Sequence, residues 1–579
     1  MNIMEYELII SKEKTYYFKY FLSVWKDMML RKDPNMKIIS EINGNVKKKP
    51  EVSIKSKFKS KFEKKIDIVS QKVKQKEDLK SMDYSIKEGS AFSVMAGFGQ
   101  NYLSAFAIAL NATNTHLAFL SSLPGLVANY FQPLGIKIAE LKQTRKEVIL
   151  HTVLAQAFIW IPLFILPLLF KDYSLWFLIT FVVLYHMLSA LHTPLWGSMM
   201  TDIVTQDQRG RYFGKRNKII GGVAFGSEIS AGLILFLFEN INIWVGFGIL
   251  FFIACIGRIV SYTYMKKIYE PEFKFQKKKQ FTIIEFIKSL RNTNYGRFVF
   301  ATSLLRFSVN VASPFFTAFI LRDLGYSYLQ YTIIISASTV ASFMTMYYWG
   351  KHSDTHGHKK IMTVTSWLIP LIPLCWALTT NFYVILAMQF LSGTAWAGFQ
   401  LAEQNYLYDA VYPERRMRGI AYHNLFKSKL IFLGSLTGAG LSSYLPSISL
   451  PSISFQASSL QVVFFISALL RACAVIFYMP MFKQLKETKV QKKDHEVFID
   501  LIAVRPISGL IITTRAHANS VVNVLDKGKK KIGSKVERMV DSGLSTMEGI
   551  IGVKQKKQDN NVVTIKGDID IKLNRKKQS

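Results

Sequence analysis

Long apolar stretches constrain this chain more than any other feature. Runs of roughly 20 residues recur between residues 88 and 483, and 50% of the chain is hydrophobic. Because a helix rises about 1.5 Å per residue, each run is long enough to cross a hydrocarbon core of about 30 Å. The runs predict an all-α membrane protein of about twelve transmembrane helices, at 88–111, 114–138, 147–170, 173–199, 218–238, 243–265, 296–321, 328–350, 361–379, 382–404, 425–445 and 459–483.

The predicted helices fall into two similar halves. Three charged residues and an asparagine of the segment TDIVTQDQRGRYFGKRN at 201–217 recur 207 positions later: Asp202, Arg209, Arg211 and Asn217 match Asp409, Arg416, Arg418 and Asn424. A displacement of this size is too long for a solenoid repeat and fits a duplicated unit. We therefore expect two pseudo-symmetric six-helix bundles, 87–265 and 296–483, joined by a charged linker at 266–295.

The basic residues are distributed unevenly among the predicted loops. The formal net charge is +34, which would fit a nucleic-acid partner. Lys and Arg, however, gather in alternate loops such as 142–146, 209–218 and 351–360, whereas the loops at 111–116 and 239–242 have none. This is the positive-inside asymmetry of membrane proteins. We expect a plasma-membrane protein with the basic loops and both termini in the cytoplasm, and no nucleic-acid partner.

Hydrophilic extensions at 1–86 and 484–579 flank the two bundles. In the first, apolar residues from Ile54 to Val73 share one helical face among many lysines. Such a basic amphipathic helix is expected to lie on an anionic leaflet, with RNA binding as the alternative. The second extension carries no recognisable motif, and its role is open.

Nothing in the sequence indicates an enzyme. We find no pairing of a nucleophile with a base, no metal cluster and no phosphate-binding loop. The three cysteines, Cys255, Cys375 and Cys473, all fall within predicted spans and form no CxxC pair. We expect no catalytic residue, no metal and no cofactor. A monomer is expected, although the sequence leaves the oligomeric state open.

One motif in the second half resembles that of a known family. Gly350-x3-Asp354-x2-Gly357-x-Lys359 is similar to the loop signature of the major facilitator superfamily of secondary transporters. The segments 395–414 and 209–217 resemble a broad, poorly characterised prokaryotic group within it. The resemblance covers about residues 88–483 and implies a transporter whose two bundles open alternately to each side of the membrane. The first, fourth, seventh and tenth spans would then line the path.

The resemblance also implies charged latches at the cytoplasmic helix ends. Asp354 would face the arginines of the loop 409–418, and Glu140 would face Arg209 and Arg211. The alternative is that these are ordinary positive-inside loops without a gating role. The candidate gating residues are Glu140, Arg145, Asp202, Arg209, Arg211, Asp354, Lys359, Asp409, Arg416 and Arg418.

Polar stripes at helical spacing mark the candidate transport path. Arg306 is the sharpest member, because a charge roughly 15 Å into a span needs a carboxylate, a water-filled cavity or an anionic ligand. We expect it to face a cavity and an anionic or polar solute; the alternative is a structural ion pair in which Glu228 serves Arg306 or Arg471. The candidate substrate-binding residues are Arg306, Asn310, Asn101, Gln100, Tyr185, His192, Trp396 and Gln400.

Proton coupling is left open by the sequence. Glu228, Glu403 and His186 are the candidates, since each is an ionisable group inside a predicted span. For the histidines, a hydrogen bond to a neighbouring hydroxyl group is the alternative.

Glycine spacing in the fifth and eleventh spans predicts close helix packing. Gly222 and Gly226, like Gly434 and Gly438, have the GxxxG spacing that lets helix backbones approach. No proline occurs between 221 and 232, so the proline-containing glycine motif of many drug antiporters of the superfamily is missing. That absence argues against drug efflux.

Taken with the resemblance, these features predict a secondary active transporter that moves a small polar or anionic solute by alternating access. The alternative is a non-transporting membrane receptor or scaffold that uses the fold to display its cytoplasmic tails. Polar stripes on four spans and two sets of gate residues favour transport, because a scaffold needs neither.

Overall fold

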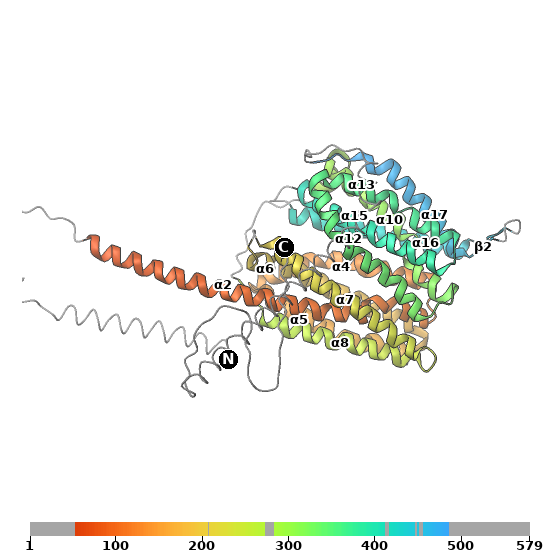
Figure 1. Cartoon of the computed structure of the whole chain (residues 1–579), viewed down its shortest axis with the longest axis horizontal. Helices are drawn as coiled ribbons and strands as arrows, with labels where there is room; N and C mark the ends of the chain where they lie inside the picture. Colours follow the sequence, from red (N-terminus) through yellow and green to blue (C-terminus); the bar gives the residue numbers. More distant parts are fainter. Residues whose placement is uncertain are drawn as a thin grey trace, which may run out of the picture. The chain divides into compact units, whose positions relative to one another are not determined.

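The computed structural model describes residues 52–205, 208–271, 283–411, 416–445, 448–450 and 455–485, and these are helical almost throughout (Figure 1). The chain forms two compact units, Met1–Glu77 and Asp78–Ser579. The predicted basic helix at 54–73 is part of α2 (Val52–Phe98), and its contact with lipid remains a prediction. The rest of the first extension and residues 486–579 of the second lie outside the described residues.

The helices occur in the order expected of two halves joined by a linker. After α2, the first half contains α3 (Leu103–Ala109), α4 (Asn114–Lys142), α5 (Arg145–Leu169), α6 (Ser174–Ile203), α7 (Arg209–Phe238) and α8 (Ile243–Lys267). The linker contains α9 (Ile283–Asn292), and the second half α10 (Asn294–Asn310), α11 (Phe316–Ala318), α12 (Tyr328–His356), α13 (His358–Leu368), α14 (Leu371–Leu378), α15 (Phe382–Ala410), α16 (Arg416–Tyr444) and α17 (Ser459–Cys473). Two short strands, β1 (Ile448–Leu450) and β2 (Phe455–Ala457), pair antiparallel between α16 and α17.

The protein is a multi-pass membrane protein. Within the described residues, 9 helical segments are long and apolar enough to cross a membrane. Large side chains on them are exposed, among them Phe252 and Phe477, each at 66%, as lipid-facing residues would be. The other three predicted spans also fall on helices (α2 with α3, α4, and α16), but their composition alone does not mark them as spans. The count of twelve therefore remains a prediction.

Local sequence explains where several helices begin and end. The hydroxyl groups of Thr113 and Thr144 cap α4 and α5 by accepting a backbone N–H three residues ahead, which satisfies an otherwise unpaired donor. Most of the predicted loop 351–360 is in fact helical, because α12 continues to His356 and α13 starts at His358. Only Gly357 interrupts the two helices, at a φ of +88° that glycine adopts at little cost.

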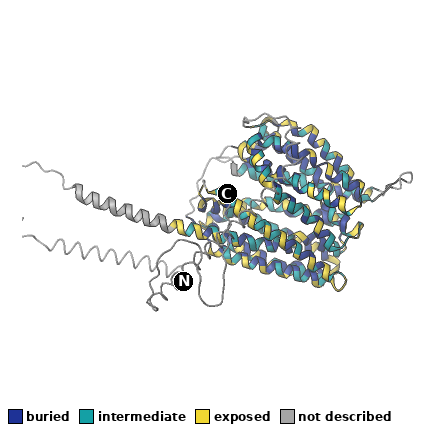
Figure 2. Ribbon diagram, in the orientation of Figure 1, coloured by how far each residue is buried: buried dark blue, intermediate teal, exposed yellow. Residues whose placement is uncertain are grey.

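Three apolar cores show how the two halves meet. The end of the bundle next to α9 is called the linker end, and the other, with the turns at 110–113 and 324–327, the far end. One core joins residues of both halves, such as Phe106 and Phe319, towards the far end. At the linker end each half has its own core, around Met199 in the first and Phe298 in the second. Buried residues accordingly run along the helices of both halves (Figure 2).

Polar contacts also cross between the halves at the far end. The hydroxyl groups of Tyr102 and Thr332 are 2.8 Å apart, and the Asn114 amide donates to the Ser442 hydroxyl at 3.0 Å. At the linker end the ion pairs described below instead join residues of one half. The far end is therefore where the halves share both a core and polar contacts.

The glycine prediction is confirmed for one helix and wrong for the other. A side chain at Gly434 or Gly438 of α16 would collide with backbone carbonyl groups at Phe307 and Val311, so these glycines allow α16 to pack closely on α10. A side chain at Gly222 or Gly226 of α7 would meet nothing within 4 Å. The same spacing on α7 therefore faces open space.

Candidate functional site

The second half contains a buried carboxylate surrounded by three basic side chains. Glu403 on α15 is 5% exposed and accepts a hydrogen bond from Nη2 of Arg306 on α10 at 2.7 Å. Its Oε1 atom lies 3.6 Å from Nζ of Lys427 and 3.9 Å from Nε2 of His423, both on α16. Coulomb attraction is stronger here than in bulk water, because the surroundings have a lower dielectric constant.

The three helices bring these groups to a similar depth. Glu403 lies about two helical turns before the end of α15, and His423 about two turns after the start of α16. Arg306 and Lys427 lie about three turns into α10 and α16 from the same end. The cluster is therefore roughly 10–18 Å from the linker end, within the membrane-spanning part of the helices.

Aromatic rings hold the Arg306 guanidinium group in place. Its central carbon lies 4.6 Å from the ring centre of Trp396 and 5.7 Å from that of Phe399. A cation over an aromatic face is attracted by the ring quadrupole. The guanidinium group therefore has a cation–π contact with Trp396, while one of its terminal nitrogens donates to Glu403.

Several polar atoms of the cluster have no hydrogen-bond partner among the described residues. These are both ring nitrogens of His423, Oε1 of Glu403 and Nε of Arg306. His423 is 0% exposed, and buried polar groups are nearly always satisfied in folded proteins. The cluster thus presents open donor and acceptor positions in its interior.

A cavity of about 240 Å³ adjoins the cluster. This volume is just below the range of about 300–1,000 Å³ typical of sites for drug-sized ligands, so it suits a small molecule. With His423 neutral, two cations and one carboxylate give the lining a net positive charge. The cavity is lined by Arg306, Gln400, Glu403, Gln404, Leu407, Ile420, His423, Asn424 and Lys427.

The structure brings only some of the predicted substrate-binding residues to this cavity. Arg306 and Gln400 line it, whereas the Asn310 side chain donates to the Arg306 carbonyl of its own helix at 2.8 Å. Gln100 and Asn101 lie in the turn between α2 and α3, where the Asn101 carbonyl accepts a hydrogen bond from Tyr331. That turn lies in the core that the two halves share towards the far end.

Tyr185 and His192 lie instead inside the first half. The Tyr185 hydroxyl approaches the Met95 sulfur at 3.5 Å, and the His186 ring packs edge-on against Tyr185. His192 Nδ1 lies 3.2 Å from the Thr152 hydroxyl, which is the hydroxyl contact that the sequence offered as the alternative. His192 and Tyr185 are 8% and 2% exposed.

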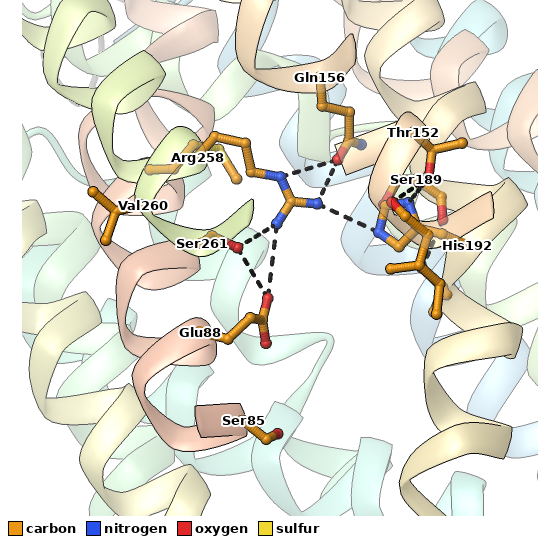
Figure 3. A network of polar contacts seen from close by, with 12 residues as sticks. Ser85, Glu88, Thr152, Gln156, Ser189, His192, Arg258, Val260 and Ser261 are labelled. Carbon is orange, nitrogen blue, oxygen red and sulfur yellow. Dashed lines mark hydrogen bonds and ion pairs between the residues drawn. The ribbon is translucent and has the colours of Figure 1, made fainter. Parts of the chain in front are cut away.

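His192 belongs to a network centred on Arg258 of α8, which the sequence reasoning missed (Figure 3). Arg258 donates to the Gln156 amide oxygen and, at 3.1 Å, to the Ser261 hydroxyl. The Ser261 hydroxyl in turn donates to Glu88 at 3.0 Å, and Arg258 itself lies 3.9 Å from that carboxylate. Arg258 is 1% exposed and Glu88 5%. A charge in the interior needs such a complete set of partners.

A third deep arginine, Arg471, is paired with carbonyl groups. It donates to the backbone oxygens of Ile369 and Val309, each at 3.2 Å. Four residues after Ile369 stands Pro373, which has no N–H to complete the helical hydrogen bond. Arg471 thus satisfies a carbonyl group that the proline leaves unpaired. The alternative of a Glu228 partner for Arg471 or Arg306 is wrong.

Glu228 instead lies at the contact between the halves. Its Oε2 atom accepts a hydrogen bond from the Thr339 hydroxyl of α12 at 3.1 Å, and its carbonyl accepts one from Tyr102 at 2.7 Å. The residue is 3% exposed. If α7 and α12 separated, the Glu228 carboxylate would therefore lose its hydrogen bond from Thr339.

Three ion pairs at the linker end involve predicted gating residues. Arg145 Nη1 binds Asp202 at 2.6 Å, and Arg145 Nε lies 3.8 Å from Glu270, where the linker begins. In the second half Asp409 lies 3.5 Å from Nε2 of His358. Asp202 and Asp409 thus each meet a basic group at the start of a helix, Arg145 of α5 and His358 of α13.

The remaining gate residues are arranged differently from the expectation. Arg209 donates to the backbone carbonyls of Thr201 on α6 and of Val204, the residue after it, which fastens the start of α7 to the end of α6. Lys359 lies 5.4 Å from the ring centre of Phe482. No described contact joins Glu140 to Arg209 or Arg211, or Asp354 to Arg418; the side chain of Arg416 lies outside the described residues.

The comparisons with known proteins agree on the class of fold. A family model described as Major Facilitator Superfamily matches residues 298–524. No curated protein matches the chain. The sequence match thus falls largely in the half that carries the cleaner motif.

Solved structures match a larger share of the chain than the family model does. A mutant of the nucleoside transporter NupG aligns with a TM-score of 0.55 and 14% identity over 70% of this chain and 100% of that chain. An autoinhibited peptide transporter of the POT family gives 0.54 and 10%, over 71% and 99%. A bacterial homologue of the iron transporter ferroportin, in an inward-facing state, gives 0.53 and 12%, over 69% and 98%. At these identities the likeness is one of fold.

Proposed function

The chain is a protein of the major facilitator superfamily, and on that premise we propose that it is a secondary active transporter that moves a small polar or anionic solute by alternating access. The observation that carries the proposal is the basic cavity around Glu403, buried within the membrane-spanning part of the second half. Keeping unpaired polar atoms and three basic groups in that region is costly, and solute binding accounts for it.

The way the halves meet supports alternating access. They share a core and hydrogen bonds at the far end but have separate cores at the linker end, as expected of a state open at the linker end. We propose that Arg145 with Asp202, and His358 with Asp409, act as latches that exchange partners when that end closes. The acid of each pair is partly exposed, Asp202 by 48% and Asp409 by 24% of its side chain, and contact with water weakens an ion pair enough for its partners to exchange.

We further propose a plasma-membrane location with the linker end in the cytoplasm. The basic loops lie at that end, in keeping with the positive-inside asymmetry. The twelve-span arrangement and the contact of the basic helix at 54–73 with an anionic leaflet belong to the same proposal.

The solute has to be inferred from the cavity. The solved relatives are described as nucleoside, peptide and iron-type transporters, so the fold does not select among solute classes. Two cations against one carboxylate favour a solute with an anionic or strongly polar group. The receptor or scaffold alternative provides no reason for this buried charge.

Uptake into proteoliposomes tests the proposal. Vesicles containing the full chain would be incubated with a defined mixture of small carboxylates, amino acids, nucleosides and sugars, and their contents measured by mass spectrometry. We expect at least one polar or anionic solute to enter faster than into protein-free vesicles, and Arg306→Met to abolish the difference, while Lys429→Met, outside the cavity lining, does not. A receptor or scaffold would give no protein-dependent uptake of any solute.

A further inference from the structure

The cavity described above has an internal anion that occupies the place of a ligand. Glu403 binds Arg306 directly and lies within 3.6 Å of Lys427. An anionic solute entering the cavity would seek the same two cations, which are its strongest available partners. It must therefore compete with Glu403.

Sharing the cations between two carboxylates is unfavourable. Glu403 is 5% exposed, and like charges in a buried site oppose each other's ionisation. The charged and titratable groups that face Glu403 from the neighbouring helices are Arg306 on α10, and His423 and Lys427 on α16. The site can accept the negative charge of a solute if Glu403 or His423 takes up a proton at the same time.

Two groups in the cluster can receive a proton. Oε1 of Glu403 and both ring nitrogens of His423 have no hydrogen-bond partner among the described residues. The two side chains approach within 3.9 Å. A proton held on this pair would be next to the cations that the solute takes over.

We propose that the cavity binds a small carboxylate by exchange, so that the solute takes Arg306 and Lys427 from Glu403 while one proton is taken up on Glu403 and His423. The proton comes from the aqueous side and forms one O–H or N–H bond. The charge of the site is the same before and after, because one negative solute enters with one proton. The inference rests on the proposed transport function and specifies its solute class and coupling ion.

Calorimetry on the full chain in lipid nanodiscs tests the exchange. Lactate and succinate serve as probes, and lactamide and succinamide as matched uncharged probes. Titrations in two buffers of different ionisation enthalpy give the number of protons taken up per ligand. We expect the carboxylates to bind and the amides not to bind, with uptake of about one proton per carboxylate group that contacts the cluster.

Variants separate the parts of the exchange. Glu403→Gln mimics the protonated carboxyl, so carboxylate binding should persist while proton uptake falls by at least half; His423→Asn tests the second group in the same way. Lys427→Met should weaken binding by at least about tenfold, because the ligand loses a charged partner. Lys429→Met is the matched control on the same helix; its Nζ lies over the Tyr130 ring, and binding should be unchanged.

Three results would overturn the inference: equal binding of carboxylate and amide, no binding of any probe, or full proton uptake retained in both Glu403→Gln and His423→Asn. If these variants do not fold, the proton count of the wild-type chain decides alone, with zero uptake overturning the exchange. Failure of the proposed function looks different. In that case carboxylates bind with proton uptake, but proteoliposomes accumulate no solute.

Discussion

Three arginines lie deep among the helices, and each is neutralised in a different way. Arg258 lies 3.9 Å from a carboxylate and reaches it through the Ser261 hydroxyl, Arg471 donates to backbone carbonyls, and Arg306 donates to a carboxylate beside a cavity. The first two are at most 2% exposed, whereas the Arg306 side chain is 16% exposed. Of these three, Arg306 thus combines a buried counter-ion with access to a ligand.

Replacing Arg258 by methionine should destabilise the first half. The change leaves Glu88 and Gln156 buried with fewer partners, and breaking a buried pair costs about 3–5 kcal/mol. Unfolding of the purified protein by detergent titration would measure the loss. Lys215→Met, at an exposed position of α7, is the control and should change stability by less than about 0.5 kcal/mol.

A double-mutant cycle tests whether Arg258 and Glu88 act as a pair. It compares Arg258→Met and Glu88→Gln, each alone, with the variant that carries both changes. The double variant removes both members of the pair, so it should recover part of the loss, with a coupling of about 0.5–3 kcal/mol. Arg216, whose Nη2 lies 3.4 Å from Glu88, loses its carboxylate partner in the single and in the double Glu88 variant alike, and this cost cancels in the cycle. If the two losses simply add, Glu88 and Arg258 do not act as a pair, and the description of this network is wrong.

The sequence showed that Arg306 needs a partner but not which one. Its depth could be inferred from the apolar run around it, whereas the pairing with Glu403 depends on how α10 and α15 pack, 97 positions apart. Arg258 carried the same signal, a base within the predicted span 243–265, and could have been found by it. Glu88 could not, because it stands at the boundary of a predicted span.

At the scale of elements, apolar length located the helices well and the ends of the loops poorly. The predicted spans all fall on helices, since each backbone group in a membrane must find a partner within its own segment. The sequence predicted a loop at 351–360 because this segment is rich in charged residues. A helix can carry charged residues, however, once it extends beyond the lipid. There α12 ends only where Gly357 turns the chain.

Packing of α16 on α10 gives a prediction at this scale. Gly438→Val should push α16 away from the Val311 carbonyl. The new side chain would overlap a backbone atom, which cannot move aside by changing rotamer as a side chain can. Overpacking of this kind costs about 1–3 kcal/mol or more, and a lowered melting temperature in detergent would measure it.

Gly440→Val is the matched control two positions away on the same helix. A side chain there would meet nothing within 4 Å, so its melting temperature should stay close to that of the unchanged protein. Equal losses in the two variants would mean that helix propensity, and not the contact with α10, sets the effect.

At the scale of the whole molecule, the two halves are joined at the far end and have separate cores at the linker end. If the protein alternates, weakening the far end must favour closure of the linker end. The Tyr102 hydroxyl bridges to Thr332 across the halves, and a hydrogen bond contributes about 1 kcal/mol. Tyr102→Phe should therefore shift the populations of the two states by about fivefold.

Distances between spin labels in lipid nanodiscs measure whether the two ends of the bundle open and close in turn. One pair, at Leu141 and Lys351, reports on the linker end, and another, at Ile241 and Tyr383, on the far end; all four sites are exposed. For Tyr102→Phe we predict more of the short distance at the linker end and more of the long distance at the far end, in equal proportion. A linker end that keeps one unchanged distance while the far end loosens would contradict alternating access.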